Sequence, residues 1–579
     1  MKNLTFDRSH FYIDDVPVKL VSGVMHYFRI HPAYWQDRLL KLKESGCNCV
    51  ETYLCWNLHE KREGQLDFSG WLDFTRFLNM AAEVGLYAIV RPGPYICSEW
   101  DLGGMPWWLL KHPDINLRCS DPLFLQLCTP YMEEVCRLLR PLLITNGGNV
   151  ILIQVENEYG SFGNDAAYLR WLRDFYISHG IDCPLITSDG PYPLLLRSGT
   201  VDGVLASVNM RKDSGQWLKA LDKAYPDQPR AIMELWTGHA NHWNTDTPPR
   251  DLQEVADSVE EALDQTELLN IYMFHGGSTF GFMNGASPNI VQMSTYDVDA
   301  PLDEFGRKTP KYYAMQKLIC KAMNQPVHNT TTDTVLREYP DVRQTGVCSL
   351  RESGLTLRCI HSPTAKTMEA CDQGYGYIIY TTTFTADAEG MSVVLPDVQD
   401  YAHVYIDGQY RKTLFRTDSD RTIPVGGIGT HAVGILVENM GRYNSGWNMT
   451  DRKGMLGQLR GREADLEMEI QLYGYDIYSL PLEELPTRFD AAAAENEPAF
   501  YRYELQVDTP EDTVVHFEGF TRGVAFLNGF NLGRHWDTVN PNNRLFIPAP
   551  LLKKGKNELI VFDVLHKPCE KKVLFREIK

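Results

Sequence analysis

Two motifs that lie far apart in the chain carry carboxylates where acid–base chemistry on a buried substrate would need them. In the first, the apolar run 151–155 leads directly into Glu156, Asn157 and Glu158. In the second, an apolar run ends at Glu234. A charge at the end of a buried strand must be paired, hydrogen-bonded or used, because burying it alone is costly. The motifs therefore predict either a polar network that closes a core or the two-carboxylate site of a glycosidase.

The residues beside these carboxylates indicate how such a site would work. In a glycosidase, Glu158 would act as general acid and base, and Asn157 would donate to the sugar 2-hydroxyl, a contact that strengthens in the transition state. A salt-bridged rim of the fold is the structural alternative. A lone strand-end glutamate such as Glu234 is more often structural, but Trp236 and Trp243 offer nearby rings for the apolar face of a sugar.

Predicted strands and helices alternate regularly in the first part of the chain, and they would position these residues. The predicted strands are residues 18–24, 49–55, 87–91, 150–155, 184–187, 203–208, 231–234 and 269–274. Between them, apolar residues recur at helical spacing, as at residues 35–44, 74–83, 131–139, 168–178, 252–263 and 312–322. Eight strand–helix units predict an α/β fold, a (β/α)8 TIM barrel. A doubly wound sheet is the alternative, but no Gly-x-Gly-x-x-Gly fingerprint supports it.

A barrel would bring the candidate residues to one opening, because chemistry in such barrels lies at the carboxyl ends of the strands. Glu99 follows the third predicted strand, Glu158 follows the fourth, and Glu234 ends the seventh. Tyr272 lies in the eighth, before a Gly-rich loop that lacks the Gly-Lys-Ser/Thr of a phosphate cradle. The three carboxylates should face the opening, and Tyr272 is as well placed to point into it as away from it.

The remainder of the chain has short alternating strands and turns, and helical patterning nearly stops. Two similar hairpin sequences turn at Asp407-Gly408 and Asn528-Gly529. We therefore predict a catalytic barrel at residues 1–325, followed by two all-β jelly-roll or sandwich domains at 326–490 and 491–579.

Composition excludes some partners and compartments. The net charge of −19 argues against nucleic acid or an anionic membrane as a partner. The chain shows neither an apolar signal segment at its start nor a run long enough for a membrane helix. Its 13 cysteines lack Cys-x-x-Cys pairs and zinc spacing, which favours a reduced, cytoplasmic protein. We expect no metal. The sequence leaves open whether the protein forms a homodimer.

The ordered motifs resemble glycoside hydrolase family 35, the β-galactosidase family that includes the lysosomal acid enzyme. The resemblance spans nearly the whole chain, and it implies that the domain at 491–579 is of a galactose-binding type. The matching segments include residues 22–27, 34–39, 56–60, 91–100, 103–107, 154–160, 234–243, 273–277, 295–301, 438–442, 451–454 and 527–534.

The resemblance implies a retaining mechanism without a cofactor, acting on an oligosaccharide. Glu158 matches the acid/base, Asn157 the 2-hydroxyl contact and Glu234 the nucleophile. A retaining pair should have its carboxyl groups about 5–5.5 Å apart. The matching substrate-binding positions are Tyr53, Cys97, Ser98, Glu99 and Tyr272.

Two departures from the family pattern bear on sugar specificity. Val298 stands where the family usually has a tyrosine, and His239 where it often has a tryptophan near the leaving group. A glucosyl, fucosyl or glucosaminyl specificity, transfer to an acceptor sugar or phosphate, and an inactive carbohydrate-binding homologue are the alternatives to an exo-β-galactosidase.

Overall fold

Eight parallel strands form a closed barrel in the computed structural model, which describes residues 2–578 except 244, 246, 298, 448, 465, 491 and 538–542. Each predicted strand is present, and the closed order excludes the doubly wound alternative. In spatial order the strands are β10 (Ala231–Trp236), β12 (Leu268–His275), β4 (Leu20–Met25), β5 (Cys49–Tyr53), β6 (Tyr87–Arg91), β7 (Val150–Gln154), β8 (Leu185–Asp189) and β9 (Leu205–Met210).

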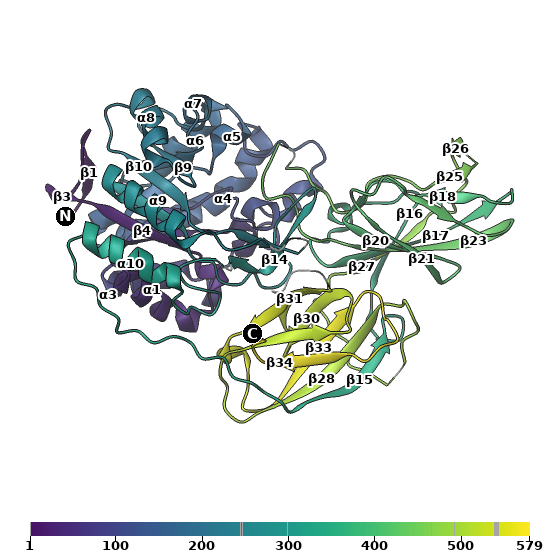
Figure 1. The fold of residues 1–579 in the computed structure, drawn as a ribbon. Coiled ribbons are helices and arrows are strands. Elements are labelled where there is room, and N and C mark those ends of the chain that lie inside the picture. Colours follow the sequence, from purple (N-terminus) through teal and green to yellow (C-terminus); the bar gives the residue numbers. More distant parts are fainter. Residues whose placement is uncertain are drawn as a thin grey trace.

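Helices surround the barrel, and each predicted helix is present (Figure 1). Asp73, Asp121, Asp165 and Asp251 accept hydrogen bonds from backbone N–H groups at the starts of four of them, which fixes where these helices begin. The helix predicted at 131–139 begins earlier and continues through a proline. The α-helices are α1 (Trp35–Glu44), α2 (Trp56–His59), α3 (Phe74–Val84), α4 (Pro122–Leu139), α5 (Tyr159–Phe162), α6 (Ala166–Ser178), α7 (Pro193–Gly199), α8 (Ser214–Ala224), α9 (Leu252–Gln265) and α10 (Pro310–Ala322).

A small sheet covers the amino ends of the barrel strands. It contains β1 (Leu4–Phe6), β2 (Phe11–Ile13) and β3 (Val16–Val18). Phe11 and Ile13 share a buried apolar cluster with residues from the barrel strands, Leu20 and Leu268 among them. This end of the barrel is therefore filled, and a cavity is left to the carboxyl ends.

Two all-β domains follow the barrel, one beside it and one below both in Figure 1. We call them the first β domain and the last β domain. Two facing sheets of the first enclose their own apolar core. The six-stranded sheet contains β16 (Arg358–Ser362), β27 (Tyr475–Leu480), β17 (Tyr377–Ala386), β23 (Gly429–Glu438), β20 (Tyr401–Ile406) and β21 (Gln409–Phe415). The four-stranded sheet contains β22 (Thr422–Pro424), β18 (Ser392–Val394), β25 (Arg460–Glu463) and β26 (Leu466–Met468). A two-stranded sheet pairs β19 (Val398–Gln399) with β24 (Gly454–Met455).

The last β domain takes one strand from before the first. Strand β15 (Val342–Ser349) pairs antiparallel with β28 (Ala499–Val507), so the prediction that placed 342–349 in the first β domain is wrong. Tyr339 and Val347 pack into the core of the last domain, which holds the strand there. The other strands are β33 (Gly555–Asp563), β30 (Arg522–Leu527) and β31 (Phe530–Trp536), then β32 (Arg544–Ile547), β29 (Thr513–Glu518) and β34 (Lys572–Phe575).

A narrow three-stranded ribbon connects the barrel mouth to the β domains. It consists of β11 (Ala240–His242), β14 (Ile290–Asp297) and β13 (Ala286–Ser287). Val291 and Met293 of the ribbon pack with Met440 of the first β domain and Trp536 of the last. In the part of the chain that the structure describes, no helix is long and apolar enough to cross a membrane.

Candidate active site

A cavity of about 280 Å³ lies at the carboxyl ends of the barrel strands. Most of the predicted site residues line it, and its wall also includes side chains that the sequence did not single out. The lining consists of Ile96, Cys97, Ser98, Glu99, Asn157, Glu158, Arg211, Glu234, Trp236, Gly238, His239, Ala240, Tyr272, Met273, Tyr296 and Asp297. Tyr272 therefore points into the opening.

Glu234 is held by donors from three strands. Arg91 donates to Glu234 Oε1 at 2.7 Å and the Tyr53 hydroxyl donates to the same oxygen at 3.1 Å. The Trp236 indole donates to Oε2 at 3.0 Å. A register shift in β10 between Ile232 and Glu234 displaces the strand locally, as bulges near active sites do. One cation and two neutral donors therefore fix the position of this carboxylate.

Arg91 organises a buried network behind the cavity. It was not among the predicted site residues. It also bonds Glu51 at 3.1 Å and donates to the side-chain oxygen of Asn157. Burial raises the pKa of Glu51 to about 7, against the opposing effect of Arg91. Glu51 lies inside β5 and Arg91 ends β6, and both side chains are fully buried. The cost of burying a charge, which drew attention to Glu158, would have identified them too.

Glu158 has different surroundings from Glu234. Its side chain accepts a hydrogen bond from Asn209 at 2.9 Å, and among the described residues no cation lies within ion-pair distance of it. Burial raises the pKa of Glu158 to about 7, and the negative charge of Glu234 adds to that shift. The carboxyl group therefore keeps a proton near neutral pH. Its backbone is left-handed, with φ of 46°, a strained conformation that clusters at functional sites.

Glu156, two residues earlier, is structural. Arg118 donates to its two carboxylate oxygens at 2.9 and 2.8 Å, and also to the backbone oxygen of Asn157 at 2.8 Å. Both partners are buried. Glu156 therefore matches the structural alternative, a salt-bridged rim, and it fixes the loop that presents Asn157 and Glu158 to the cavity.

Glu99 is a second acceptor group in the cavity wall. The Tyr272 hydroxyl is 3.3 Å from Glu99 Oε2, and the Tyr296 hydroxyl donates to the same oxygen. Burial raises the pKa of Glu99. Arg29 supports this wall by donating to the Ser98 backbone oxygen at 2.6 Å and stacking over the Tyr296 ring at 3.9 Å. Cys97, Ser98 and Glu99 are all left-handed, with φ of 56°, 60° and 46°. Tyr296 was missed because β14 was not predicted.

The two predicted tryptophans have different positions. Trp236 is 37% exposed at the cavity and keeps its place in the site. Trp243 is only 1% exposed and packs among Val291, Met293 and Met440, so its prediction as a sugar platform is wrong. Strand β11 carries the chain away from the cavity before residue 243. Of the two departures, His239 lines the cavity, and Val298 lies outside the described residues.

A larger cavity of about 1180 Å³ lies over the outer face of the six-stranded sheet in the first β domain. Its acidic lining residues, Asp476 and Glu497, are both partly exposed, which does not meet the requirement for paired buried carboxylates. Among the described residues, the one cluster of His, Cys, Asp and Glu donors close enough to share an ion is Cys359, His361 and Asp476, in that domain. The barrel cavity is the candidate active site.

Comparisons with known proteins agree with this geometry. The chain matches the family described as Glycosyl hydrolases family 35 over residues 10–322. It also matches the first all-beta domain of beta-galactosidase over 365–481 and its galactose-binding domain over 498–557. A beta-galactosidase from Xanthomonas manihotis is 39% identical, covering 93% of this chain and 90% of the relative. A beta-galactosidase from Homo sapiens is 35% identical, covering 98% and 88%.

Proposed function

The chain belongs to glycosyl hydrolase family 35 and is a glycoside hydrolase, and from this premise we propose that it is a retaining, exo-acting β-galactosidase. It would release terminal non-reducing β-D-galactosyl residues from oligosaccharides or glycoconjugates. The names of its relatives support galactose as the sugar. The observation that carries the mechanism is the pair Glu158 and Glu234, which share one cavity in opposite electrostatic surroundings.

In the first step, the two carboxyl groups act together on the glycosidic bond. Protonated Glu158 gives its proton to the glycosidic oxygen while ionised Glu234 attacks the anomeric carbon. The bond from that carbon to the leaving oxygen breaks, and a covalent sugar–Glu234 ester forms. Arg91 and Tyr53 hold the Glu234 carboxylate in position for the attack.

In the second step, water replaces the leaving group. Glu158, now ionised, takes a proton from the water while the water oxygen attacks the anomeric carbon, and Glu234 leaves as a carboxylate. Two inversions give back the β-anomer. The acid/base is thereby returned to its protonated form for the next cycle.

The cavity supports binding of one terminal sugar. Its volume of about 280 Å³ is small for a ligand site, which favours an exo-acting enzyme. Arg91 fixes the side-chain oxygen of Asn157, which orients the amide NH2 group as a donor to the 2-hydroxyl. Glu99 and Tyr272 offer an acceptor and a hydroxyl to other sugar hydroxyls, and Trp236 lies where the ring of a sugar could stack.

A panel of nitrophenyl glycosides tests the proposal. We expect the β-galactoside to be cleaved fastest, and proton NMR to detect β-galactose first. Faster cleavage of the β-glucoside or β-glucosaminide would reassign the sugar, and initial α-galactose would exclude retention. Transfer to added sugar or phosphate would identify a transferase or phosphorylase. Absence of cleavage throughout would leave the inactive homologue.

Val298 supplies a finer test of sugar recognition. A missing hydroxyl there removes one donor, worth about 0.5–1.5 kcal/mol, so β-fucoside, which lacks the 6-hydroxyl, should be cleaved comparatively well. Val298→Tyr should shift preference toward galactoside. An unchanged galactoside-to-fucoside ratio would remove Val298 as a specificity determinant.

We also propose a reducing, cytoplasmic location. All thirteen cysteines are free thiols, and most are buried. Fractionation of cells that express the native chain, with alkylation of thiols at lysis, would test it. Accumulation in an oxidising compartment would contradict the proposal.

A further inference from the structure

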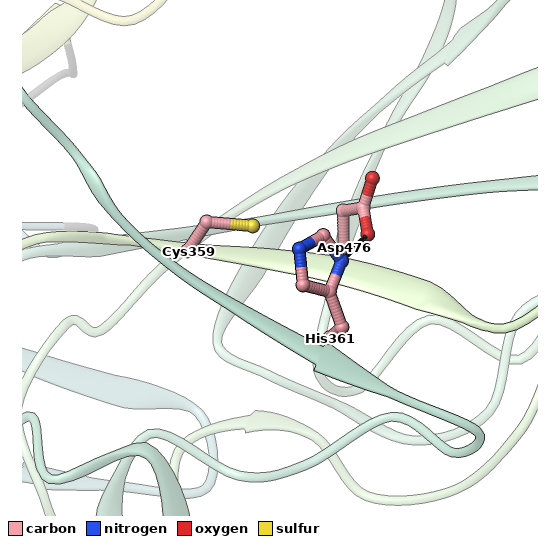
Figure 2. Close-up of side chains that lie close together, drawn as sticks. All are labelled: Cys359, His361 and Asp476. Atoms are coloured by element: carbon pink, nitrogen blue, oxygen red, sulfur yellow. Dashed lines mark hydrogen bonds and ion pairs between the residues drawn. The ribbon is translucent and has the colours of Figure 1, made fainter.

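Three metal-ligating side chains meet on one face of the first β domain. Cys359 and His361 lie on β16, and Asp476 lies on the neighbouring β27 (Figure 2). One donor atom from each lies within 4.8 Å of the other two. In Figure 2 one ring nitrogen of His361 faces Asp476 and the other faces the Cys359 sulfur. The His361 Nδ1–Asp476 distance is 2.5 Å.

The sheet itself sets this arrangement. Residues two apart on a strand point to the same face, so Cys359 and His361 share a face of β16. His361 is the direct cross-strand partner of Asp476, and Cys359 is the partner of Tyr478. Asp476 is therefore opposite one donor and diagonal to the other, which are the near neighbours in an antiparallel pair.

A thiolate, an imidazole and a carboxylate form a ligand set that suits zinc. Zinc binds Cys, His and carboxylate ligands at about 2.0–2.3 Å and is usually tetrahedral. Such bonds place donor atoms roughly 3.4–3.6 Å apart, and the three present donor atoms lie within 4.8 Å of one another. We propose that Cys359, His361 and Asp476 bind one thiophilic divalent cation, zinc being the best match, with a fourth position open to water.

Exposure makes the site accessible to a cation from solution. The side chains of His361 and Asp476 are 81% and 45% exposed. An exposed His–Asp pair contributes little to stability by itself. In the metal-free protein the Cys359 thiol has a hydrogen-bond partner in Tyr478, which the cation would displace.

The cation would connect an edge strand to the rest of the sheet. Strand β16 is at the end of the order β16-β27-β17-β23-β20-β21 and has one neighbour. Ligands from both β16 and β27 would close a bridge across that single pairing. Metal that binds the folded protein alone raises its thermal midpoint by mass action. The barrel cavity contains none of these residues, so glycosidase activity should not depend on the site.

Cobalt is the sharpest probe, because a cobalt–thiolate bond gives an ultraviolet charge-transfer band that oxygen and nitrogen ligands do not give. The full-length chain, reduced, freed of chelator and without a histidine tag, would be titrated with CoCl2 and then with ZnCl2. We expect one equivalent of cobalt to produce the band and zinc to abolish it. Cys359→Ser should lose the band, and His361→Ala should weaken cobalt binding at least tenfold.

Cys569→Ser is the matched control, because Cys569 is the other exposed cysteine. It should keep the band, and all these variants should keep wild-type cleavage of nitrophenyl galactoside. A band that survives Cys359→Ser, or disappears in Cys569→Ser, would overturn the proposal. So would absence of a band at millimolar cobalt, in which case the cluster is an ion pair beside a thiol.

Discussion

The barrel mouth and the junction with the first β domain both bury charged groups, but they neutralise them differently. At the junction, Lys453 donates to Asp400 and to Asp451, each at 2.9 Å, and to the Gly441 backbone oxygen at 2.8 Å. Arg416 adds a second cation, 2.7 Å from Asp400. At the barrel mouth, Glu158 accepts from the neutral amide of Asn209 and shares its cavity with a second carboxylate.

The difference in partners gives Asp400 and Glu158 opposite pKa shifts. Burial works against the charge on Asp400, but Lys453 and Arg416 outweigh it and lower the pKa. Burial raises the pKa of Glu158 to about 7, because no adjacent cation outweighs it. Buried charge alone therefore does not identify a functional site. The functional site is where one carboxylate is left without a cation and faces a cavity.

The largest effect should follow removal of the ionised carboxylate at the mouth. Glu234→Gln cannot form the covalent intermediate, so kcat/KM should fall on the order of 10⁴–10⁶-fold. The thermal midpoint should change little, and azide should restore part of the activity. The assay is cleavage of nitrophenyl galactoside at equal concentrations of folded protein. A loss below tenfold would show that Glu234 is not the nucleophile.

Removing the shared cation at the junction should affect folding instead. Lys453→Met leaves Asp400 and Asp451 buried with Arg416 alone, which should cost about 3–5 kcal/mol of stability. Activity per folded molecule should stay near wild type. Thermal and denaturant unfolding would measure the change, with Lys412→Met, which breaks an exposed pair with Asp420, as control. Equal stability of the two variants would end the contrast between regions.

The uncompensated carboxylate should cost stability while it supplies activity. Because its pKa is raised to about 7 from 4.5, Glu158 disfavours the folded state above pH 7 by up to about 3 kcal/mol, a cost absent below pH 4.5. Glu158→Gln should therefore be more stable than wild type at pH 8 and about equal at pH 4.5. Unfolding at both pH values would measure this, and a variant less stable at pH 8 would contradict it.

The same proton should set the alkaline side of the activity profile. A general acid works while protonated, so wild-type kcat/KM should fall as pH rises through about 7. In Glu158→Gln this decline should disappear, on a background that is about 10²–10⁴-fold lower for poor leaving groups. An activated aryl glycoside would provide enough signal. A decline retained in the variant would assign it to another group.

The smallest effect should come from a mouth residue that acts through another. Glu51 bonds Arg91 but does not line the cavity, so it is a positioning residue. Glu51→Gln removes one charge-assisted contact, and we expect about a tenfold loss in kcat with KM unchanged. Glu51→Asp should recover part of it. Loss through KM alone would indicate a role in substrate binding instead.

The sequence predicted the elements of the barrel because their signal is local. Continuous apolar runs mark strands that are buried on both faces, and all eight are found in the closed sheet. The same runs contained Glu51, inside its strand, and Arg91, at the end of its strand, but their role became evident only from their contacts with each other and with Glu234. Asn209 was missed because the predicted strand stopped at residue 208.

Local sequence patterns do not predict contacts between residues that are far apart in the chain. Trp243 was placed at the site because it is near Glu234 in sequence, but β11 turns the chain into the apolar cluster with Met440. Strand β15 precedes the first β domain in sequence and pairs with β28, a partner that alternation cannot reveal. The contact between Arg118 and Glu156 is what distinguishes the role of Glu156 from that of Glu158, and the sequence does not predict this contact.

The ribbon at the barrel mouth has a consequence for how this gene can be recombined. One part of it, Ala240 and Asp297, forms cavity wall, while Val291 and Met293 pack on Met440. A truncated gene that encodes the barrel alone would expose that apolar surface and release the wall from its support. The catalytic unit is thus the entire chain, and chimaeric enzymes should inherit the ribbon and its β-domain partner from one parent.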